Sequence, residues 1–387
     1  MPVINRIAEF AQDMQAWRHH LHMHPELQFD CHQTAAFVAA RLREFGVDEV
    51  HEGLAESGVV AVINGQGAGP TIGLRADMDA LPITEVKDHA YKSQTPGKMH
   101  ACGHDGHTTM LLGAAKYLAE TRRFAGRVAL IFQPAEEGGG GAKVMCDEGL
   151  MERFGITQVY ALHNLPGAQA GHFLGRPGPI MAAADVFTIR ITGNGAHAAK
   201  PNEGTDPIVV GAQMVTALQT LVSRNIDPLK SAVLSVTTFH AGTAHNIIPE
   251  SAVLQGTVRT LDAEMQQFMI DRMHMVVENI AAAFGATAVL DYERGYPVTV
   301  NHADALEFAA DVAREVSGDA GVEVDTAPMM GGEDFSYMLE ERRGAYLFLG
   351  QGESAGLHHP HYDFNDEISP VGASYFAKLV ERAQPLP

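Results

Sequence analysis

The sequence has few cysteines: three in 387 residues, at Cys31, Cys102 and Cys146. An odd number of thiols cannot all pair, and three are too few for a disulfide framework. We therefore expect a protein of the reducing cytoplasm rather than an exported one. The first residues contain acidic side chains and no continuous apolar core, so no secretory signal is expected there.

Basic residues and long apolar runs are also scarce. Lys and Arg number 27 against 47 Asp and Glu, a net charge of −20 with histidine neutral. Such a surface repels phosphate backbones and anionic lipid, so neither a nucleic-acid partner nor a membrane partner is expected. No window reaches the roughly 18 uninterrupted apolar residues that a membrane-spanning helix needs.

Apolar residues and histidines, by contrast, are plentiful. The chain is 46% hydrophobic and contains 20 histidines. Its length predicts two or three domains, and its composition can build a large core. What decides the function is where the histidines lie.

The first part of the chain alternates between helical and strand patterns. Residues 4–21 and 34–45 repeat apolar side chains every three to four positions, which predicts helices. Helical stretches then separate short apolar runs, predicted as strands at 59–63, 71–74, 127–132 and 158–162. This order predicts an α/β fold with a mostly parallel sheet covered by helices.

This alternation of helical and strand patterns changes near Pro177 and resumes near residue 300. Between them the predicted order is strand, helix, strand, strand, helix, strand, which is typical of a ferredoxin-like α+β unit. We therefore predict two domains: a catalytic domain of residues 1–182 and 297–387, and an inserted ferredoxin-like lid or dimerisation domain of residues 183–296.

Metal-type side chains follow four predicted strands, which are 71–74, 127–132, 158–162 and a further apolar run at 346–349. In open α/β sheets, ligands bind beyond the carboxyl ends of the strands. Four such ends therefore predict one site, and these residues follow them: Asp77 and Asp79; Glu136 and Glu137; His163; and His358, His359 and His361.

The densest group of metal-type residues is Cys102-Gly103-His104-Asp105-Gly106-His107. Thiolate, imidazole and carboxylate together suit zinc or another first-row divalent ion. The alternative is a helix start in which Asp105 caps the helix and the histidines are solvated.

The adjacent carboxylates of Glu136 and Glu137 repel each other unless a positive charge holds them. A metal ion would do so, with one carboxylate as ligand and its neighbour as general base on a water molecule. The alternative is a solvated loop, because Glu-Glu pairs are common on surfaces.

Eight motifs, spread over the whole chain, carry a resemblance to a known family. The chain resembles the dinuclear metal amidohydrolases, a family that includes hippurate hydrolases, N-acyl-amino-acid amidohydrolases (aminoacylases) and auxin-conjugate hydrolases. The motifs are GLRADMDALP, MHACGHDGHTTMLLGAA, FQPAEEGGGGA, ALHNLPG, GNGAHAAKPNEGTDP, HNIIPESAVLQGTVRT, MGGEDFSYM and LHHPHYDFND.

The resemblance implies two divalent metal ions per subunit, which could be zinc, manganese, cobalt or nickel. It implies Glu136 as general base, Asp79 as a supporting group in the catalytic site, and Cys102 as the bridge between the ions. His358 is preferred to His359 because the family's ligand follows the leucine of this motif. The implied metal ligands are Cys102, His104, Glu137, His163 and His358.

Three residues of the insert are implied to bind substrate. His197 resembles the residue that polarises the scissile carbonyl, often from a second subunit. Asn246 and Arg259 resemble the groups that hold the substrate's carboxylate. The alternatives are a histidine of the hinge loop for His197 and an arginine on a strand surface for Arg259.

The chain departs from the family's remote carboxypeptidases at two positions. Asp77 stands where they use a histidine, and Cys102 stands where they use a bridging aspartate. At both positions the chain resembles the acylamino-acid branch of the family instead.

The expected activity is metal-dependent hydrolysis of the amide bond of N-acyl amino acids, which releases a carboxylic acid and a free amino acid. The alternatives are a metal-dependent dipeptidase or carboxypeptidase and, in a different class, a metal-dependent binding protein without turnover. The resemblance also implies a homodimer or homotetramer assembled through the inserted domain.

Overall fold

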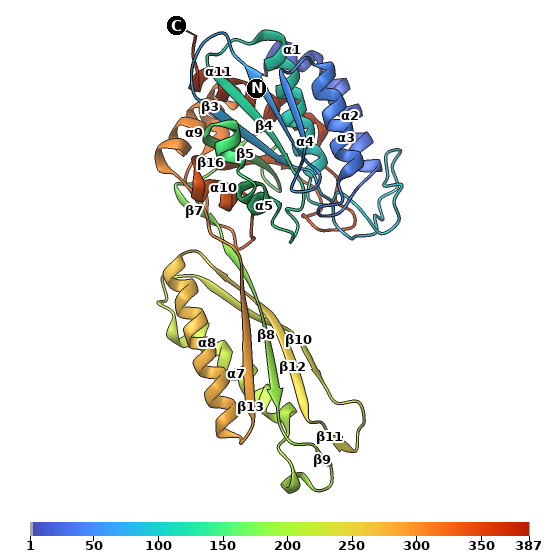
Figure 1. Ribbon diagram of the computed structural model, residues 1–387, viewed down its shortest axis with the longest axis vertical. Coiled ribbons are helices and arrows are strands. Elements are labelled where there is room, and N and C mark those ends of the chain that lie inside the picture. The colour runs from blue at the N-terminus through green and yellow to red at the C-terminus, as the bar shows by residue number, and fades with distance from the viewer. Residues whose placement is uncertain (1–2, 387) are drawn as a thin grey trace. The chain divides into compact units, whose positions relative to one another are not determined.

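The structure is a computed structural model that describes residues 3–386, and the chain divides into two compact units (Figure 1). The first unit comprises Met1–Gly178, Val300–Ala327 and Asp334–Pro387. The second comprises Pro179–Thr299 and Pro328–Glu333, so it interrupts the first in sequence. The predicted insert, residues 183–296, lies inside the second unit.

An eight-stranded sheet forms the centre of the first unit, in the order β1-β2-β4-β3-β5-β16-β6-β15. β3 pairs in parallel with β4 and β5, and β5 pairs in parallel with β16. β1, β2 and β6 add antiparallel pairs toward the edges. The strands are β1 (Glu49–Leu54), β2 (Gly58–Asn64), β3 (Thr71–Asp77), β4 (Arg127–Gln133), β5 (Ile156–Pro166), β6 (Phe173–Leu174), β15 (Val322–Glu323) and β16 (Arg343–Gly352).

Both faces of this sheet are buried. In β4, for example, Val128 and Leu130 belong to the main apolar cluster, while Ala129 and Ile131, which point to the opposite face, are also fully buried. The predicted fold class, a mostly parallel sheet covered by helices, is thereby confirmed. The covering helices are α1 (Asn5–Glu9), α2 (Ala11–Met23), α3 (His32–Glu44), α4 (His104–Thr121), α5 (Gly141–Asp147), α6 (Leu150–Phe154), α9 (Ala303–Ser317), α10 (Phe335–Glu341) and α11 (Ser369–Ala383).

Two local features of the first unit differ from the predicted elements. Residues 4–21 form two helices rather than one, because the backbone leaves the helix at Phe10 between α1 and α2. β1 has no counterpart among the predicted strands, since it is a sheet edge whose side chains are mostly polar and partly exposed.

The second unit is a four-stranded antiparallel sheet in the order β10-β12-β8-β13, with α7 and α8 packed against it (Figure 1). The chain order β8, α7, β10, β12, α8, β13 is the ferredoxin-like order predicted for the insert. Its elements are β8 (Ala183–Thr192), α7 (Pro207–Thr220), η2 (Leu221–Asn225), β10 (Ala232–Ala241), β12 (Ser251–Thr260), α8 (Ala263–Ala283) and β13 (Thr287–Tyr296).

Short elements complete the described part of the chain, in which no helix is both long and apolar enough to cross a membrane. They are the strand pairs β9 (Ala196–His197) with β11 (Ile247–Ile248) and β7 (Gly178–Met181) with β14 (Thr299–Asn301), and the helical turns η1 (Pro201–Glu203), η3 (Asp319–Gly321) and η4 (Asp366–Ile368).

The parallel core of the first sheet decides where polar residues gather. β3, β4, β5 and β16 all run in the same direction, so their carboxyl ends lie at one edge of the sheet. The metal-type side chains lie near these carboxyl ends, as His163 does in β5, or in the chain segments that follow the strands.

Candidate metal centre

Two groups of metal-type side chains meet at this edge, and they share one residue. Cys102, His104 and His163 form the first group, and Cys102, Glu137 and His358 form the second. Within each group the ligand atoms lie within 4.8 Å of one another. Cys102 is the residue that the two groups share.

The spacing of the ligand atoms suits metal binding. Cys102 Sγ lies 3.4 Å from His163 Nε2, and His358 Nε2 lies 3.2 Å from Glu137 Oε1. Two nitrogen or oxygen ligands, each about 2.1 Å from a tetrahedral ion, are roughly 3.4 Å apart. The residues therefore fit a divalent ion without rearrangement of the backbone.

Two histidines are held so that Nε2 faces the centre. His104 Nδ1 lies 2.8 Å from the backbone oxygen of Asp79, and His163 Nδ1 lies 2.7 Å from that of Asn164. A carbonyl oxygen only accepts, so each Nδ1 carries a proton and Nε2 is the ring nitrogen left to bind a cation, as in metal-binding histidines. His104 Nε2 is buried without a hydrogen-bond partner, which is the environment a metal ligand needs before its ion binds.

The carboxylate of Asp79 positions the two adjacent glutamates. Its two oxygens accept hydrogen bonds from the backbone N–H groups of Glu136 and Glu137, both at 3.0 Å. The preceding residue, Ala135, has a φ of +57°, a left-handed conformation that is uncommon for alanine. The loop after β4 is thus held in one conformation that directs both glutamates to the centre.

Negative charge dominates the centre and shifts the pKa values of its ligands. Burial, reinforced by the charges of Glu137 and Glu136, raises the pKa of the Cys102 thiol well above its usual value. Burial opposes protonation of His104, but the charges of Asp77 and Asp79 outweigh it and raise its pKa to about 10. A site that retains protons this strongly also favours a bound cation, which neutralises the same carboxylates.

Burial and the nearest charged neighbours also shift the pKa values of the remaining proposed ligands. Burial, together with the charge of His107, lowers the pKa of His163 well below its usual value. Burial would raise the pKa of Glu137, but its contact with His358 outweighs burial and lowers it. That contact raises the pKa of His358.

A layer of buried polar residues lies behind the ligands. Asp77 and His107 belong to the sequence groups that predict the site, but no residue of this layer is among the predicted catalytic, substrate-binding or metal residues. Asp77 Oδ1 lies 2.6 Å from His107 Nδ1, and His107 Nε2 lies 2.7 Å from Asn164 Oδ1. Arg75 donates to the other oxygen of Asp77 at 2.6 Å and to Asp334 at 2.9 Å. The available signal was that Asp77 and Asn164 stand at or near the carboxyl ends of β3 and β5, but only the tertiary contacts identify their partners.

Gly103 separates the two ligands Cys102 and His104 and has a φ of +95°. A β-carbon at this position would lie 2.2 Å from Asn164 Oδ1 and 2.7 Å from Tyr362 Oη. Glycine is therefore required between these ligands, both for its backbone conformation and for the space it leaves.

The two adjacent histidines after β16 have different surroundings. His358 contacts Glu137 and has a φ of +61°. His359 Nδ1 accepts a hydrogen bond from the backbone N–H of His361, and the two rings stack. This placement favours His358 over His359 as the ligand.

The other predicted residues, His197, Asn246 and Arg259, belong to the second unit. His197 and Asn246 are exposed. They are close together, since the backbone N–H of Ala198 donates to the backbone oxygen of Asn246 at 3.0 Å. Arg259 lies near the opposite end of β12, and burial lowers its pKa. The strand from Ser251 to Arg259 spans roughly 26 Å, so Asn246 and Arg259 of one chain lie far apart.

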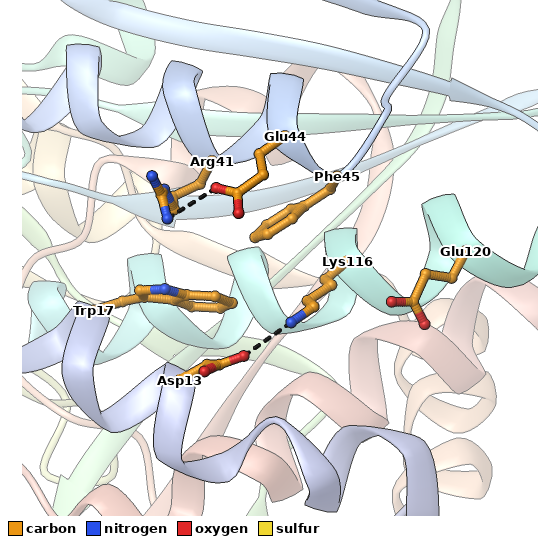
Figure 2. A pocket seen from close by; sticks show the side chains of 7 residues that line it. All are labelled: Asp13, Trp17, Arg41, Glu44, Phe45, Lys116 and Glu120. Atoms are coloured by element: carbon orange, nitrogen blue, oxygen red, sulfur yellow. Dashed lines mark hydrogen bonds and ion pairs between the residues drawn. The ribbon is translucent and has the colours of Figure 1, made fainter.

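Figure 2 shows a separate pocket of about 330 Å³ on the first unit. Lys116 pairs with Asp13 at 2.9 Å, and Arg41 pairs with Glu44 at 2.8 Å. Most charged groups of this pocket are therefore paired with an opposite charge, and none of the predicted site residues lines it. Its lining residues are Asp13, Trp17, Arg41, Glu44, Phe45, Lys116 and Glu120.

Comparison with known proteins points to one family. Residues 73–382 match the model of peptidase family M20/M25/M40. The chain is 42% identical over 379 residues to a hippurate hydrolase of Campylobacter jejuni, covering 98% of both chains. It is 42% identical over 371 residues to an N-acetyl-L-cysteine deacetylase of Bacillus subtilis, covering 95% of this chain and 87% of the other.

A solved structure agrees with these sequence matches. The YXEP protein of Bacillus subtilis, described as a dinuclear metal-binding peptidase of the M20 family, superposes with a TM-score of 0.86. The two sequences are 34% identical, with 97% of this chain and 98% of the other covered. The predicted family resemblance is confirmed.

Proposed function

The chain belongs to peptidase family M20/M25/M40, and on that premise we propose that it hydrolyses the amide bond of N-acyl amino acids with two divalent cations. The products would be a carboxylic acid and a free amino acid. Relatives named hippurate hydrolase and N-acetyl-L-cysteine deacetylase, each 42% identical, support this substrate class.

One observation carries the proposal: two ligand groups share Cys102, and Glu136 lies beside them. His104, Glu136 and Glu137 also form a group with ligand atoms within 4.8 Å of one another. Glu137 faces His358, and Glu136 Oε2 lies 4.0 Å from His104 Nε2. A carboxylate beside the ligand set is what a general base on water requires.

The bound cations would polarise the scissile carbonyl and lower the pKa of a water molecule toward 7. Glu136 would then remove a proton from that water as it attacks the carbonyl carbon. The same carboxyl group would return the proton to the leaving nitrogen when the carbon–nitrogen bond breaks. Asp79 would hold Glu136 in place during both steps, because its carboxylate accepts a hydrogen bond from the backbone N–H of Glu136.

We propose that His197, Asn246 and Arg259 bind the substrate, with His197 stabilising the oxyanion and Arg259 pairing with the carboxylate. The span of roughly 26 Å along β12 between Ser251 and Arg259 supports a site that takes these groups from two copies of the chain. We therefore also propose a homodimer or homotetramer. A fully active enzyme that sedimented strictly as a monomer would refute this arrangement.

Zinc, manganese, cobalt and nickel remain the proposed metals, since a thiolate with imidazole and carboxylate ligands suits each of them. A cytoplasmic location is proposed because Cys31, Cys102 and Cys146 are all unpaired and buried, as in proteins of reducing compartments.

The decisive experiment compares hippurate, N-acetyl amino acids and dipeptides as substrates, with Zn²⁺, Mn²⁺, Co²⁺ or Ni²⁺ added to metal-free enzyme. We expect the acyl amino acids to be hydrolysed fastest. Preferred cleavage of dipeptides would identify a dipeptidase or carboxypeptidase instead. Tight metal binding without turnover of any amide would identify a binding protein.

A further inference from the structure

A second cluster of metal-type side chains lies in the first unit, apart from the candidate metal centre. His22 comes from α2, while Glu85 and His89 come from the segment between β3 and α4. Their ligand atoms lie within 4.8 Å of one another. Glu85 Oε1 is 3.2 Å from His22 Nε2 and 2.6 Å from His89 Nε2.

The other ring nitrogen of each histidine has a carboxylate nearby, which is hydrogen-bonded only in His22. His22 Nδ1 lies 2.8 Å from Asp105 Oδ2, and His89 Nδ1 lies 3.7 Å from Asp363 Oδ2. His89 Nδ1 is buried and has no hydrogen-bond partner. A carboxylate hydrogen-bonded to the other ring nitrogen is the usual support of a metal-binding imidazole, and His22 has this support from Asp105.

The carboxylate of Glu85 is oriented for the same purpose. Its Oε2 accepts a hydrogen bond from the backbone N–H of Ser93 at 2.7 Å. Oε1 therefore faces the two imidazoles. The side chains of His22 and Glu85 are 0% and 1% exposed, and that of His89 is 12% exposed, so His89 marks the route to solvent.

The segment that contributes Glu85 and His89 is a long connection without regular secondary structure. Residues 78–103 carry no helix or strand, and connections longer than about 12–15 residues without secondary structure are uncommon in compact domains. Val86 N–H donates to Pro360 O at 3.0 Å, so this segment packs on the loop that holds His358. The supporting carboxylates also adjoin the candidate centre, because Asp105 follows His104 and Asp363 lies on the His358 loop.

We propose that His22, Glu85 and His89 bind a structural divalent cation of the zinc class, separate from the candidate metal centre. Two imidazoles and one carboxylate with an open fourth position are an established zinc ligand set. The ion would displace the two protons held between Glu85 Oε1 and the Nε2 atoms of His22 and His89, and it would tie α2 to residues 78–103. The competing arrangement is a protonated His22 paired with Glu85 and Asp105 and no ion at all.

The test is a metal count on the full-length protein. Metal-free protein is reloaded with Zn²⁺, freed of excess ion by gel filtration and analysed for elemental zinc. We expect His89→Ala to hold one zinc fewer per chain than the unmodified protein, three becoming two when the candidate centre is fully loaded. His32→Ala, whose side chain is 64% exposed, is the matched control and should lose none. Equal zinc in the His89→Ala variant and the unmodified protein would overturn the proposal.

Cobalt distinguishes this ion from those of the candidate centre. A Co²⁺ ion bound by Cys102 produces a thiolate charge-transfer band, whereas a site of two histidines and a glutamate does not. We expect His89→Ala to lose one Co²⁺ while that band is unchanged, and a weakened band would overturn the proposal.

A second variant, His89→Gln, preserves polarity and hydrogen bonding but removes the imidazole. It should also lose one ion, with amide hydrolysis within about twofold of the unmodified enzyme, and retention of that ion would overturn the proposal. Absence of amide hydrolysis in every form, together with the loss of one ion, would refute the proposed function while leaving this site intact.

Discussion

At the scale of single residues, the candidate centre depends on which atom of each side chain is left free. Backbone carbonyls hold His104 and His163 by Nδ1, so both present Nε2. Asp79 holds Glu136 and Glu137 by their N–H groups rather than by their carboxylates. Both glutamates thus keep their carboxylates for the centre.

The first prediction concerns Glu136→Gln. The amide has almost the same shape but cannot accept a proton, so kcat should fall by about 10²–10⁴. Zinc content should stay as in the unmodified enzyme, because Glu137 is the proposed ligand. Glu353→Gln, at an exposed position, is the control. Hydrolysis by Glu136→Gln at the normal rate would refute the base assignment.

At the scale of elements, the amino end of α4 is the most constrained part of the centre. Gly103 precedes α4, His104 and His107 lie in its first turn, and Asn164 of β5 packs directly against Gly103. A small change in the backbone at Gly103 would displace two proposed ligands, Cys102 and His104, together.

The second prediction compares Gly103→Ala with Gly97→Ala. Both glycines have positive φ, but a β-carbon at Gly97 has no atom within 4 Å. Gly97→Ala should therefore lower the free energy of unfolding by about 1–2 kcal/mol, the strain of an alanine in the left-handed conformation. Gly103→Ala adds the clash with Asn164 and should cost more and reduce zinc content. Equal denaturation midpoints and equal zinc content in the two variants would contradict this.

The third prediction concerns the tie between α2 and η4. Arg18 is fully buried and donates to both oxygens of Asp366, at 2.7 and 2.8 Å. Burial alone would raise the pKa of Asp366, but the bonds from Arg18 outweigh it and lower the pKa. Asp366→Asn should destabilise the protein by about 3 kcal/mol at pH 7, because it leaves a buried cation poorly paired.

The effect of this substitution should depend on pH. A carboxyl group with a lowered pKa stabilises the fold above its ordinary pKa of about 4, and that stabilisation is lost as the pH falls through the lowered value. Denaturant curves of Asp366→Asn and the unmodified protein should therefore converge below about pH 4. Asp13→Asn, in an exposed ion pair, should change stability by less than about 1 kcal/mol throughout. A pH-independent difference would contradict the assignment.

At the scale of the whole molecule, metal binding and folding are coupled. The ligands come from β5, α4, the segment just before α4 and the loops after β4 and β16, which an unfolded chain does not hold together. A cation that binds only the folded chain adds about 2.7 kcal/mol per site when its free concentration is 100 times Kd.

The fourth prediction is that chelation lowers Tm by several degrees and abolishes hydrolysis, and that added Zn²⁺ restores both. Because burial and the neighbouring carboxylates raise the pKa of Cys102, the thiol must lose a proton when the ion binds. The Zn²⁺-induced rise in Tm should therefore shrink as the pH is lowered. Scanning calorimetry at several pH values measures this, and a Tm unaffected by chelation would refute a metal centre at Cys102.

Much of this protein follows from its sequence alone. The alternation of apolar runs with helical stretches predicts the parallel sheet, and the order of strand and helix patterns predicts the ferredoxin-like unit. The metal-type residues were identifiable because the carboxyl ends of parallel strands meet at one edge, whatever the details of packing. Neighbouring residues encode the local periodicity, and helices between successive strands favour parallel pairing, so the sequence indicates both.

Only the tertiary structure decided which side chains support the ligands. The Asp77–His107–Asn164 chain and the cluster of His22, Glu85 and His89 join residues that are distant in sequence. Such contacts depend on how helices rotate and pack against a sheet and on where an irregular segment settles, and no local pattern encodes these. The separation of Asn246 from Arg259 likewise comes from the run of β12, because both residues belong to one motif in the sequence yet lie toward opposite ends of a strand.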